Sequence, residues 1–277
     1  MNAAELILND DGSIYHLHLW PEDIAPIVIL VGDPDRVPLV SAHFDRIDFQ
    51  KQKREFITHT GWIGAQRFTV ISTGIGTDNI DIVLNELDAL VNIDLQSRQI
   101  RDTLTSLVLI RIGTSGSLHP DIDVDDVVVS TLAVGTDSIG MFYESEKANH
   151  PLLPPWAYLT RSYPFSLQSF SLPFKEGITL TCPGFYGPQR RILRISPSYS
   201  IPLDGLHTSA IENIPFSNLE MESAAIYLLA EKMGHKPISF NVILANRLAG
   251  RFSKDADQPM DALISAVLAW APSTMHP

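Results

Sequence analysis

Short apolar runs recur along the chain and alternate with stretches in which apolar positions follow helical spacing. The runs rich in β-branched side chains predict buried strands at Ile27–Val31, Phe68–Ser72, Leu107–Ile112, Val127–Thr131, Ile178–Thr181 and Ile238–Leu244. Helical spacing predicts helices at Asp78–Val91 and Leu219–Met233, the second with one apolar stripe from Met221 to Leu229. Strands and helices that alternate in this way predict an α/β sandwich.

The segment Ser145–Phe174 breaks this alternation. It holds many prolines, serines and aromatic residues without a clear period, so we expect an extended loop or lid there and not a separate domain. No repeat, linker or low-complexity tract divides the chain. We therefore expect a single domain over residues 1–277, a length that suffices for one large buried core.

Composition and charge exclude several classes of partner. The net charge of -12 comes without any basic cluster, which argues against nucleic acid, although a few local arginines can still bind a small anion. The single cysteine, Cys182, can form neither an intramolecular disulfide nor a metal site. With no apolar stretch long enough to span a bilayer and no export signal at the N-terminus, we expect a cytoplasmic protein without a membrane partner.

Two glycine-containing segments at predicted strand ends carry arginines. Gly32–Arg36 follows the first strand directly, and Arg111–Gly116 combines a guanidinium, a hydroxyl and a flexible backbone. Backbone N–H groups at such glycines and a guanidinium nearby can bind an anion such as phosphate. Alternatively, Gly32–Arg36 is a strand-to-helix turn with a surface arginine and Arg111–Gly116 is only a tight turn, so both interpretations stay open. Gly74–Gly76 completes neither a dinucleotide-binding fingerprint nor a Walker loop.

Ser217–Ser223 has a structural and a functional interpretation. Ser217 and Glu220 fit a capping box at the start of the predicted helix. Alternatively, the carboxylate of Glu220 or Glu222 accepts hydrogen bonds from the vicinal hydroxyls of a sugar. The two interpretations are compatible with each other.

Phe185–Arg191 is the most informative segment. It offers an aromatic ring to stack on a base, an amide at Gln189 to read the edge of that base, and the guanidinium of Arg191. A Gln amide can accept from N3–H of uracil while it donates to O2, and an arginine can donate to O4. Taken alone, the segment is as readily explained as a polar loop.

In their order along the chain, these segments resemble the nucleoside phosphorylase I family, and within it the uridine phosphorylases, from Tyr15 to about Arg251. The resemblance is carried by Tyr15–Leu17, Gly32–Val37, Arg54–Phe56, Ser72–Gly76, Arg111–Thr114, Gln189–Arg191, Glu220–Ser223 and Asn246–Arg247. It implies a three-layer α/β/α sandwich with a central mixed, partly barrel-like sheet. It also implies a pentosyltransferase that converts uridine and phosphate to uracil and ribose 1-phosphate, with phosphate as a second substrate and no cofactor or metal.

The resemblance also assigns roles to individual residues. The phosphate ligands would be Gly32, Arg36, Arg54, Arg111 and Thr114. The ribose ligands would be His16, Glu220, Met221 and Glu222. The base would be bound by Phe185, Gln189 and Arg191, and the catalytic groups would be Arg191, Arg247 and Arg111. His16, which would contact the 5'-hydroxyl, and Arg54 would come from a neighbouring subunit, so the resemblance implies a homodimer or a hexamer built as a trimer of dimers, with shared active sites.

Three alternatives remain within and beyond this family. Purine phosphorylases of the family place a Ser-Asp pair where this chain has Asn246 and Arg247, and nucleosidases lack the full set of phosphate arginines. A non-catalytic nucleoside-binding module on the same scaffold is the third. The chain also departs from the family pattern at two places. Thr77–Asn79 differs from the small turn usual in the family, and Asn79 argues against the monovalent cation that relatives bind near Glu55, Ile75 and position 79. Val91–Ser106 resembles an insertion, which we expect to alter a surface or a subunit contact.

Overall fold

The computed structural model describes residues 1–275, which fall into two compact units. The first unit comprises Met1–Ile110 and Leu229–Lys236, and the second comprises Arg111–Leu228 and the described residues from Pro237 onwards. Residues 276 and 277 lie outside the described part of the chain. The single domain expected over residues 1–277 stays a prediction.

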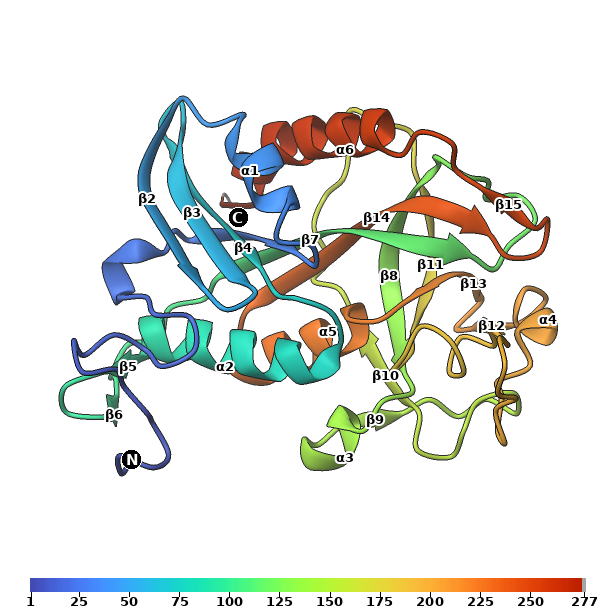
Figure 1. The fold of residues 1–277 in the computed structure, drawn as a ribbon, viewed down its shortest axis with the longest axis horizontal. Coiled ribbons are helices and arrows are strands. Elements are labelled where there is room, and N and C mark those ends of the chain that lie inside the picture. The colour runs from blue at the N-terminus through green and yellow to red at the C-terminus, as the bar shows by residue number, and fades with distance from the viewer. Residues whose placement is uncertain (276–277) are drawn as a thin grey trace. The chain divides into compact units, whose positions relative to one another are not determined.

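The first unit is built on a sheet with the strand order β1-β4-β3-β2. Its strands are β1 (Ile27–Val31), β2 (Arg46–Lys53), β3 (Phe56–Ile63) and β4 (Gln66–Ser72) (Figure 1). β1 is parallel to β4, whereas β3 is antiparallel to both of its neighbours. Every residue of β1 is buried, as its continuous apolar run predicts.

The other elements of this unit cover and extend the sheet. The helix α1 (Arg36–Ser41) packs against β3 and β4. The helix α2 (Thr77–Asn92) buries an apolar stripe that includes Ile80, Leu84 and Leu87. A 3-10 turn at Pro21–Asp23 precedes β1, and a small hairpin of β5 (Ile93–Asp94) and β6 (Gln99–Ile100) follows α2.

The second unit contains a closed circuit of strands. Its members are β7 (Val108–Ser117), of which residues 111–117 belong to this unit, β8 (Val127–Gly135), β11 (Lys175–Thr181), β13 (Ile214–Glu220) and β14 (Lys236–Asn246). Hydrogen-bonded neighbours run β13-β11-β8-β14-β7, and an antiparallel pairing of Asn218 with Ser117 joins β13 back to β7 (Figure 1). The sheet of this unit is therefore barrel-like.

Short elements surround this circuit. The strands are β9 (Glu146–Lys147), β10 (Tyr158–Arg161), β12 (Ala210–Ile211) and β15 (Arg251–Phe252). The helices are α3 (Ile139–Phe142), α4 (Leu203–Leu206), α5 (Ser223–Met233, which ends in the first unit), α6 (Asp257–Trp270) and a 3-10 turn at Ala271–Met275. Trp270 of α6 packs edge-on against Phe240 of β14. Within residues 1–275, no helix is both long and apolar enough to cross a bilayer.

The six predicted strands and the helix at Asp78–Val91 are confirmed, but three expectations were incomplete or wrong. The second predicted helix begins at Ser223 and not at Leu219, because the preceding residues continue β13 and pair with β11. Ser217 and Glu220 therefore lie in a strand and form no capping box. The segment Ser145–Phe174 is not wholly loop, since β10 within it pairs antiparallel with β8.

Candidate functional site

Arg111 is the buried centre of the candidate site in the second unit. Its guanidinium donates to Oδ1 of Asn241 at 2.7 Å and to Oε2 of Glu222 at 2.5 Å, and it lies 3.4 Å from Oε2 of Glu220. Burial opposes the charge of Arg111, but the two carboxylates outweigh burial and raise its pKa. The arrangement fixes a permanent cation beside two carboxylates inside the barrel.

The segment after Arg111 is strand and not a tight turn, because β7 continues to Ser117. The turn interpretation of Arg111–Gly116 was therefore wrong. Glycine is required at position 113 of this strand, because a Cβ there would lie 1.7 Å from Nη1 of Arg111. The guanidinium occupies the space that any larger residue would take, while the side chain of Thr114 is partly exposed.

Glu220 is held by donors from its own polypeptide. Its Oε1 accepts from the hydroxyl of Thr181 at 2.6 Å. Its Oε2 accepts from the backbone N–H groups of Glu222 and Ser223, at 3.0 and 2.9 Å, and from the hydroxyl of Ser223. These bonds stabilise the start of α5, where N–H groups lack helical partners. Glu220 thus caps the helix from the end of the preceding strand. The capping-box hypothesis had assigned this capping role to Ser217.

The predicted base-reading residues come together in the loop after β11. Arg191 donates to the backbone oxygen of Phe185 at 2.9 Å and to Oε1 of Gln189, and its Cζ lies 3.7 Å from the centre of the Phe185 ring. Arg247, which follows β14, donates to the backbone oxygen of Gln189 at 3.0 Å. The structure therefore gathers one aromatic ring, one amide and two guanidinium groups, as the sequence hypothesis requires.

The two arginines lie in a partly desolvated, positive environment. Burial, followed by repulsion from Arg247, lowers the pKa of Arg191 to about 10. Burial also lowers the pKa of Arg247. The repulsion that Arg247 exerts on the guanidinium of Arg191 would be relieved by a negative charge placed near the two groups. Cys182, at the start of this loop, is buried, and burial raises the pKa of its thiol to about 12.

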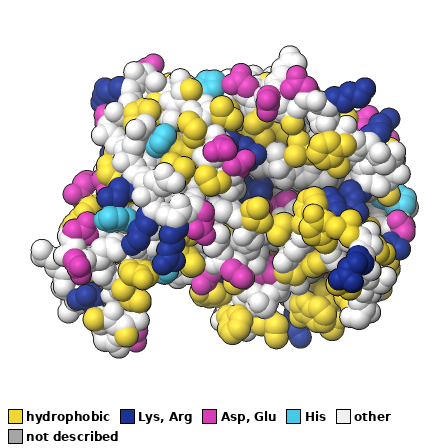
Figure 2. Space-filling view, in the orientation of Figure 1, with side chains coloured by type: hydrophobic (Ala, Val, Ile, Leu, Met, Phe, Trp, Pro, Cys, Tyr) yellow, Lys and Arg dark blue, Asp and Glu magenta, His cyan; other side chains and the backbone are white. Residues whose placement is uncertain are grey.

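The same loop reverses the usual placement of apolar and polar side chains. Gln189 is only 3% exposed, whereas Phe185 and Tyr186 are about half exposed and Leu193 is 74% exposed. Figure 2 shows hydrophobic side chains gathered over the loops between β11 and β12. The buried amide oxygen of Gln189 has Arg191 as its hydrogen-bond donor, as a buried polar group requires, while apolar side chains of the same loop stay exposed.

In the first unit, the predicted phosphate loop Gly32–Arg36 forms a tight turn before α1. The backbone N–H of Arg36 donates to the backbone oxygen of Asp33 at 3.0 Å, and Oδ1 of Asp33 accepts from the N–H of Asp35. A Cβ on Gly32 would lie 3.5 Å from the backbone oxygen of Gly74. The loops that follow β1 and β4 therefore approach each other closely at their glycines.

His16 and Arg54, which are far apart in sequence, both contact Tyr15 in the first unit. The rings of Tyr15 and His16 meet edge-on with centroids 4.8 Å apart, and Cζ of Arg54 lies 5.9 Å from the Tyr15 ring. Arg54 is exposed at the tip of the β2–β3 hairpin and has a positive φ of 55°. Lys53 fixes the segment by donating to the backbone oxygen of Tyr15 at 2.5 Å. The two residues expected to serve a neighbouring subunit thus share one surface.

Glu55, on the same hairpin tip, is hydrogen-bonded by Asn79, which belongs to the segment that departs from the family pattern. The amide nitrogen of Asn79 donates to Oε1 of Glu55 at 3.2 Å. This N–H already contacts a carboxylate oxygen that a cation at that position would need. Whether a monovalent ion binds near Asn79 stays a prediction.

Sequence reasoning missed several groups that hold the predicted residues in place. Asn241 accepts a hydrogen bond from Arg111, and Thr181 donates one to Glu220. As single polar residues within apolar strands, Asn241 and Thr181 gave no distinctive pattern in the sequence. Asp137 is buried and accepts from the hydroxyl of Tyr158 at 2.9 Å. Burial raises the pKa of Asp137. For Asn241 and Thr181, a polar residue inside an apolar run was the only available signal.

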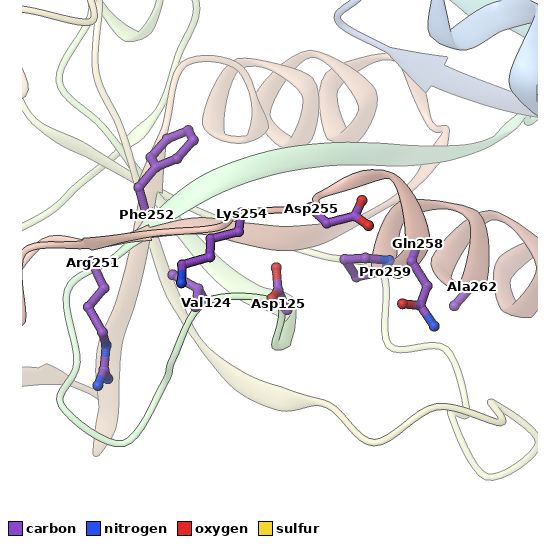
Figure 3. A pocket seen from close by; sticks show the side chains of 9 residues that line it. All are labelled: Val124, Asp125, Arg251, Phe252, Lys254, Asp255, Gln258, Pro259 and Ala262. Atoms are coloured by element: carbon purple, nitrogen blue, oxygen red, sulfur yellow. The ribbon is translucent and has the colours of Figure 1, made fainter.

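A separate pocket in the second unit involves none of the predicted site residues. It has a volume of about 780 Å³ and lies beside β15 and the start of α6 (Figure 3). The lining residues are Val124, Asp125, Arg251, Phe252, Lys254, Asp255, Gln258, Pro259 and Ala262. Its acidic and basic side chains are mixed, and Arg251 is already paired with Asp123 at 2.6 Å. The clusters around the buried Arg111 and the partly buried Arg191 are better candidates for chemistry.

Comparison with known proteins agrees with this geometry. The sequence profile described as "Phosphorylase superfamily" matches residues 26–271. A uridine phosphorylase of Thermococcus kodakarensis is 29% identical over 259 residues, which cover 92% of this chain and 86% of the relative. A DeoD-type purine nucleoside phosphorylase of Listeria monocytogenes is 26% identical over 225 residues, covering 81% and 83%.

A solved structure gives the same result for the fold. A Trypanosoma brucei nucleoside phosphorylase, described as showing uridine phosphorylase activity, superposes with a TM-score of 0.83 at 25% identity and covers 95% of this chain and 98% of its own. This likeness confirms the expected α/β class with a mixed, partly barrel-like sheet.

Proposed function

The chain belongs to the phosphorylase superfamily, and from this premise we propose that it catalyses the reversible phosphorolysis of uridine to uracil and ribose 1-phosphate. The observation that carries the choice of base is the cluster of Gln189, Arg191 and Arg247 on one loop and one strand end. A buried amide beside two guanidinium groups fits the alternating acceptor, donor and acceptor edge of uracil. Cytosine, with a lone pair at N3 and an amino group at C4, does not fit it.

In the proposed reaction, an oxygen of phosphate attacks C1' of ribose as the bond from C1' to N1 of uracil breaks. The electron pair of that bond passes to N1 and spreads to O2 and O4. Arg191 and Arg247 stabilise this charge, so their interaction with the base strengthens towards the transition state. Positioning and electrostatics provide the rate acceleration, and no covalent enzyme intermediate forms.

The ribose and phosphate roles are part of the same proposal. Glu222 and Met221, with Glu220 beside them, hold the ribose. The carboxylate of Glu220 already accepts four hydrogen bonds from the protein, which fix its position. Arg111 and Thr114 bind phosphate. The guanidinium of Arg111 has five N–H donors, and its contacts with Asn241, Glu222 and Glu220 use three at most. The resemblance gives a phosphate role also to Gly32, Arg36 and Arg54.

The active protein is proposed to be a homodimer or a larger assembly in the cytoplasm, without a cofactor. His16 and Arg54 around Tyr15 support a shared site, because these are the residues that would serve a neighbour. Co-expression of differently tagged Arg54→Ala and Arg111→Ala chains tests this. Each variant alone is expected to be nearly inactive, and assemblies purified through both tags are expected to regain part of the activity. Mixed assemblies as inactive as either parent would contradict the shared site.

The purine phosphorylase is the rival with direct support, because such enzymes are among the similar proteins. Release of free base from uridine, cytidine and inosine, measured with and without phosphate, separates the possibilities. We expect uridine to be cleaved only with phosphate. Phosphate-independent release of ribose would indicate a nucleosidase, preference for inosine would indicate a purine enzyme, and no turnover would indicate a binding module.

The base-reading cluster allows a sharper test with a control on the same loop. Gln189→Ala and Arg191→Ala each remove the hydrogen-bond partner of a polar group on the bound uracil. An unpaired buried group costs about 1 to 3 kcal/mol, which lowers kcat/KM for uridine about tenfold or more. Arg191→Ala should act mainly on kcat. Arg190→Ala is the control, since Arg190 points to Asp204 at 2.8 Å and has no assigned role. Near-normal efficiency of both test variants would refute the pyrimidine assignment.

A further inference from the structure

Glu86 of α2 holds the segment that contains His16. Its carboxylate accepts from the backbone N–H of His16 at 2.9 Å and from the backbone N–H of Leu17 at 2.8 Å. Oε1 of the same carboxylate lies 2.6 Å from Nδ1 of the His16 ring. One side chain therefore fixes both the backbone and the ring of this residue. No role for Glu86 follows from the base, ribose and phosphate assignments above.

These contacts determine which ring nitrogen of His16 carries a proton. The two backbone groups can only donate, so the carboxylate that receives them acts as an acceptor. An ionised carboxylate at 2.6 Å from Nδ1 can only accept there as well, and Nδ1 must therefore be protonated. In the neutral ring, the lone pair is then on Nε2.

The opposite edge of the ring is available to a ligand. The side chain of His16 is 26% exposed, whereas that of Glu86 is 13% exposed. Across residues 1–275, Nε2 of His16 has no hydrogen-bond partner. Tyr15, packed edge-on against the ring, restricts its rotation. The ring is thus oriented with an acceptor towards its exposed side.

We propose that Glu86 is a positioning residue that sets the tautomer of His16, so that Nε2 accepts a hydrogen bond from the 5'-hydroxyl of the nucleoside. The inference rests on the proposed function, which supplies the nucleoside. It adds a selection rule: substrates with a free 5'-hydroxyl are favoured over 5'-deoxynucleosides, which have no donor. A 5'-phosphate is disfavoured, because an ionised phosphate group brings acceptors and negative charge towards an acceptor that is backed by a carboxylate.

The kinetic test compares uridine with 5'-deoxyuridine. In Glu86→Gln, the amide can donate to Nδ1 and so favour the tautomer with the proton on Nε2. We expect kcat/KM for uridine to fall about tenfold, as for loss of one hydrogen bond, with little change for 5'-deoxyuridine. His16→Ala should remove the same preference, and Glu86→Gln should add nothing further in the His16→Ala background. Asp78→Asn, an exposed carboxylate-to-amide change on the same helix, is the control and should leave the ratio unchanged.

A purely structural role for Glu86 predicts a different pattern. Both substrates would then lose efficiency equally in Glu86→Gln, and this loss would add to that of His16→Ala, which would overturn the proposal. The ¹⁵N chemical shifts of His16 in the unmodified, ligand-free protein supply a readout independent of activity and of variant folding. Protonation at Nδ1 is expected, and protonation at Nε2 alone would overturn the inference. If Nδ1 is protonated but no nucleoside is cleaved, the positioning geometry stands and the proposed function fails.

Discussion

Replacing Gly113 by alanine should displace the buried guanidinium of Arg111 without altering any charged residue. The new Cβ would lie 1.7 Å from Nη1, 2.4 Å from Cζ and 2.8 Å from Nη2 of Arg111, and atoms cannot approach so closely. The guanidinium must move, although its bonds to Asn241 and Glu222, at 2.7 and 2.5 Å, hold it in this place. The substitution therefore breaks a buried ion pair by steric contact alone.

The expected decrease in the free energy of unfolding follows from the loss of the hydrogen bonds and the ion pair of Arg111. A hydrogen bond to a charged group contributes about 1.5 to 3 kcal/mol, and removing one partner of a buried ion pair costs about 3 to 5 kcal/mol. Because Arg111 moves and is not deleted, we expect a loss of about 2 to 4 kcal/mol in the free energy of unfolding. At about 1.4 kcal/mol per factor of ten, a loss of 3 kcal/mol changes the folding equilibrium by roughly a hundredfold.

Urea unfolding of Gly113→Ala beside Gly116→Ala measures this effect. Both glycines lie in β7, but a Cβ on Gly116 would meet its nearest neighbour, Cγ of Arg247, at 3.4 Å, which is close to ordinary contact. The two variants therefore share the substitution and the strand, and differ in whether Arg111 must move. Unfolding free energies within about 0.5 kcal/mol of each other would refute the steric explanation of Gly113.

Two other buried groups allow predictions. Burial raises the pKa of Asp137, so the folded state binds its proton more tightly than the unfolded state, and stability is lost as pH rises from the unfolded pKa of about 3.8 through the higher folded pKa. Asp137→Asn should thus be more stable than the parent at pH 7, with an advantage that shrinks as the pH falls towards 4 in urea titrations; a constant difference would contradict this. Burial raises the pKa of the Cys182 thiol to about 12, so maleimide at pH 7 should label it only after unfolding, and rapid labelling of the native protein would show an accessible thiol.

The sequence predicted the buried strands well, because a fully buried strand such as β1 needs a continuous apolar run. It failed where one strand meets the next helix. Between Phe216 and Glu222, the pattern of apolar and polar residues is compatible with either state, and the pairing of β13 with β11 and β7 decides for a strand. The strand β2 was missed because its outer face is polar and largely exposed.

The candidate site was predicted unevenly. Arg191, Gln189 and Arg247 were grouped by the resemblance, since Arg191 and Arg247 are 56 positions apart and no periodicity joins them. The groups that orient the site, such as Asn241 and Glu86, could not be predicted because their roles depend on which strand or helix lies beside them. Spatial partners of this kind are a property of the fold and not of local sequence.

The polar side chains inside the barrel form a continuous ladder that ends at Arg111. Ser115 accepts from Asn218, Asn218 accepts from Thr179, Thr179 bonds to Ser130, and Asn241 donates to Ser130 while it accepts from Arg111. Its rungs come from β7, β13, β11, β8 and β14. A slip of one residue between any two of these strands would turn the hydroxyl or amide of one rung to the opposite face of the sheet and leave its partner unbonded in the interior. These hydrogen bonds therefore favour one register of the five strands. The bond from the guanidinium of Arg111 to Asn241 belongs to the same network, so it too depends on that register.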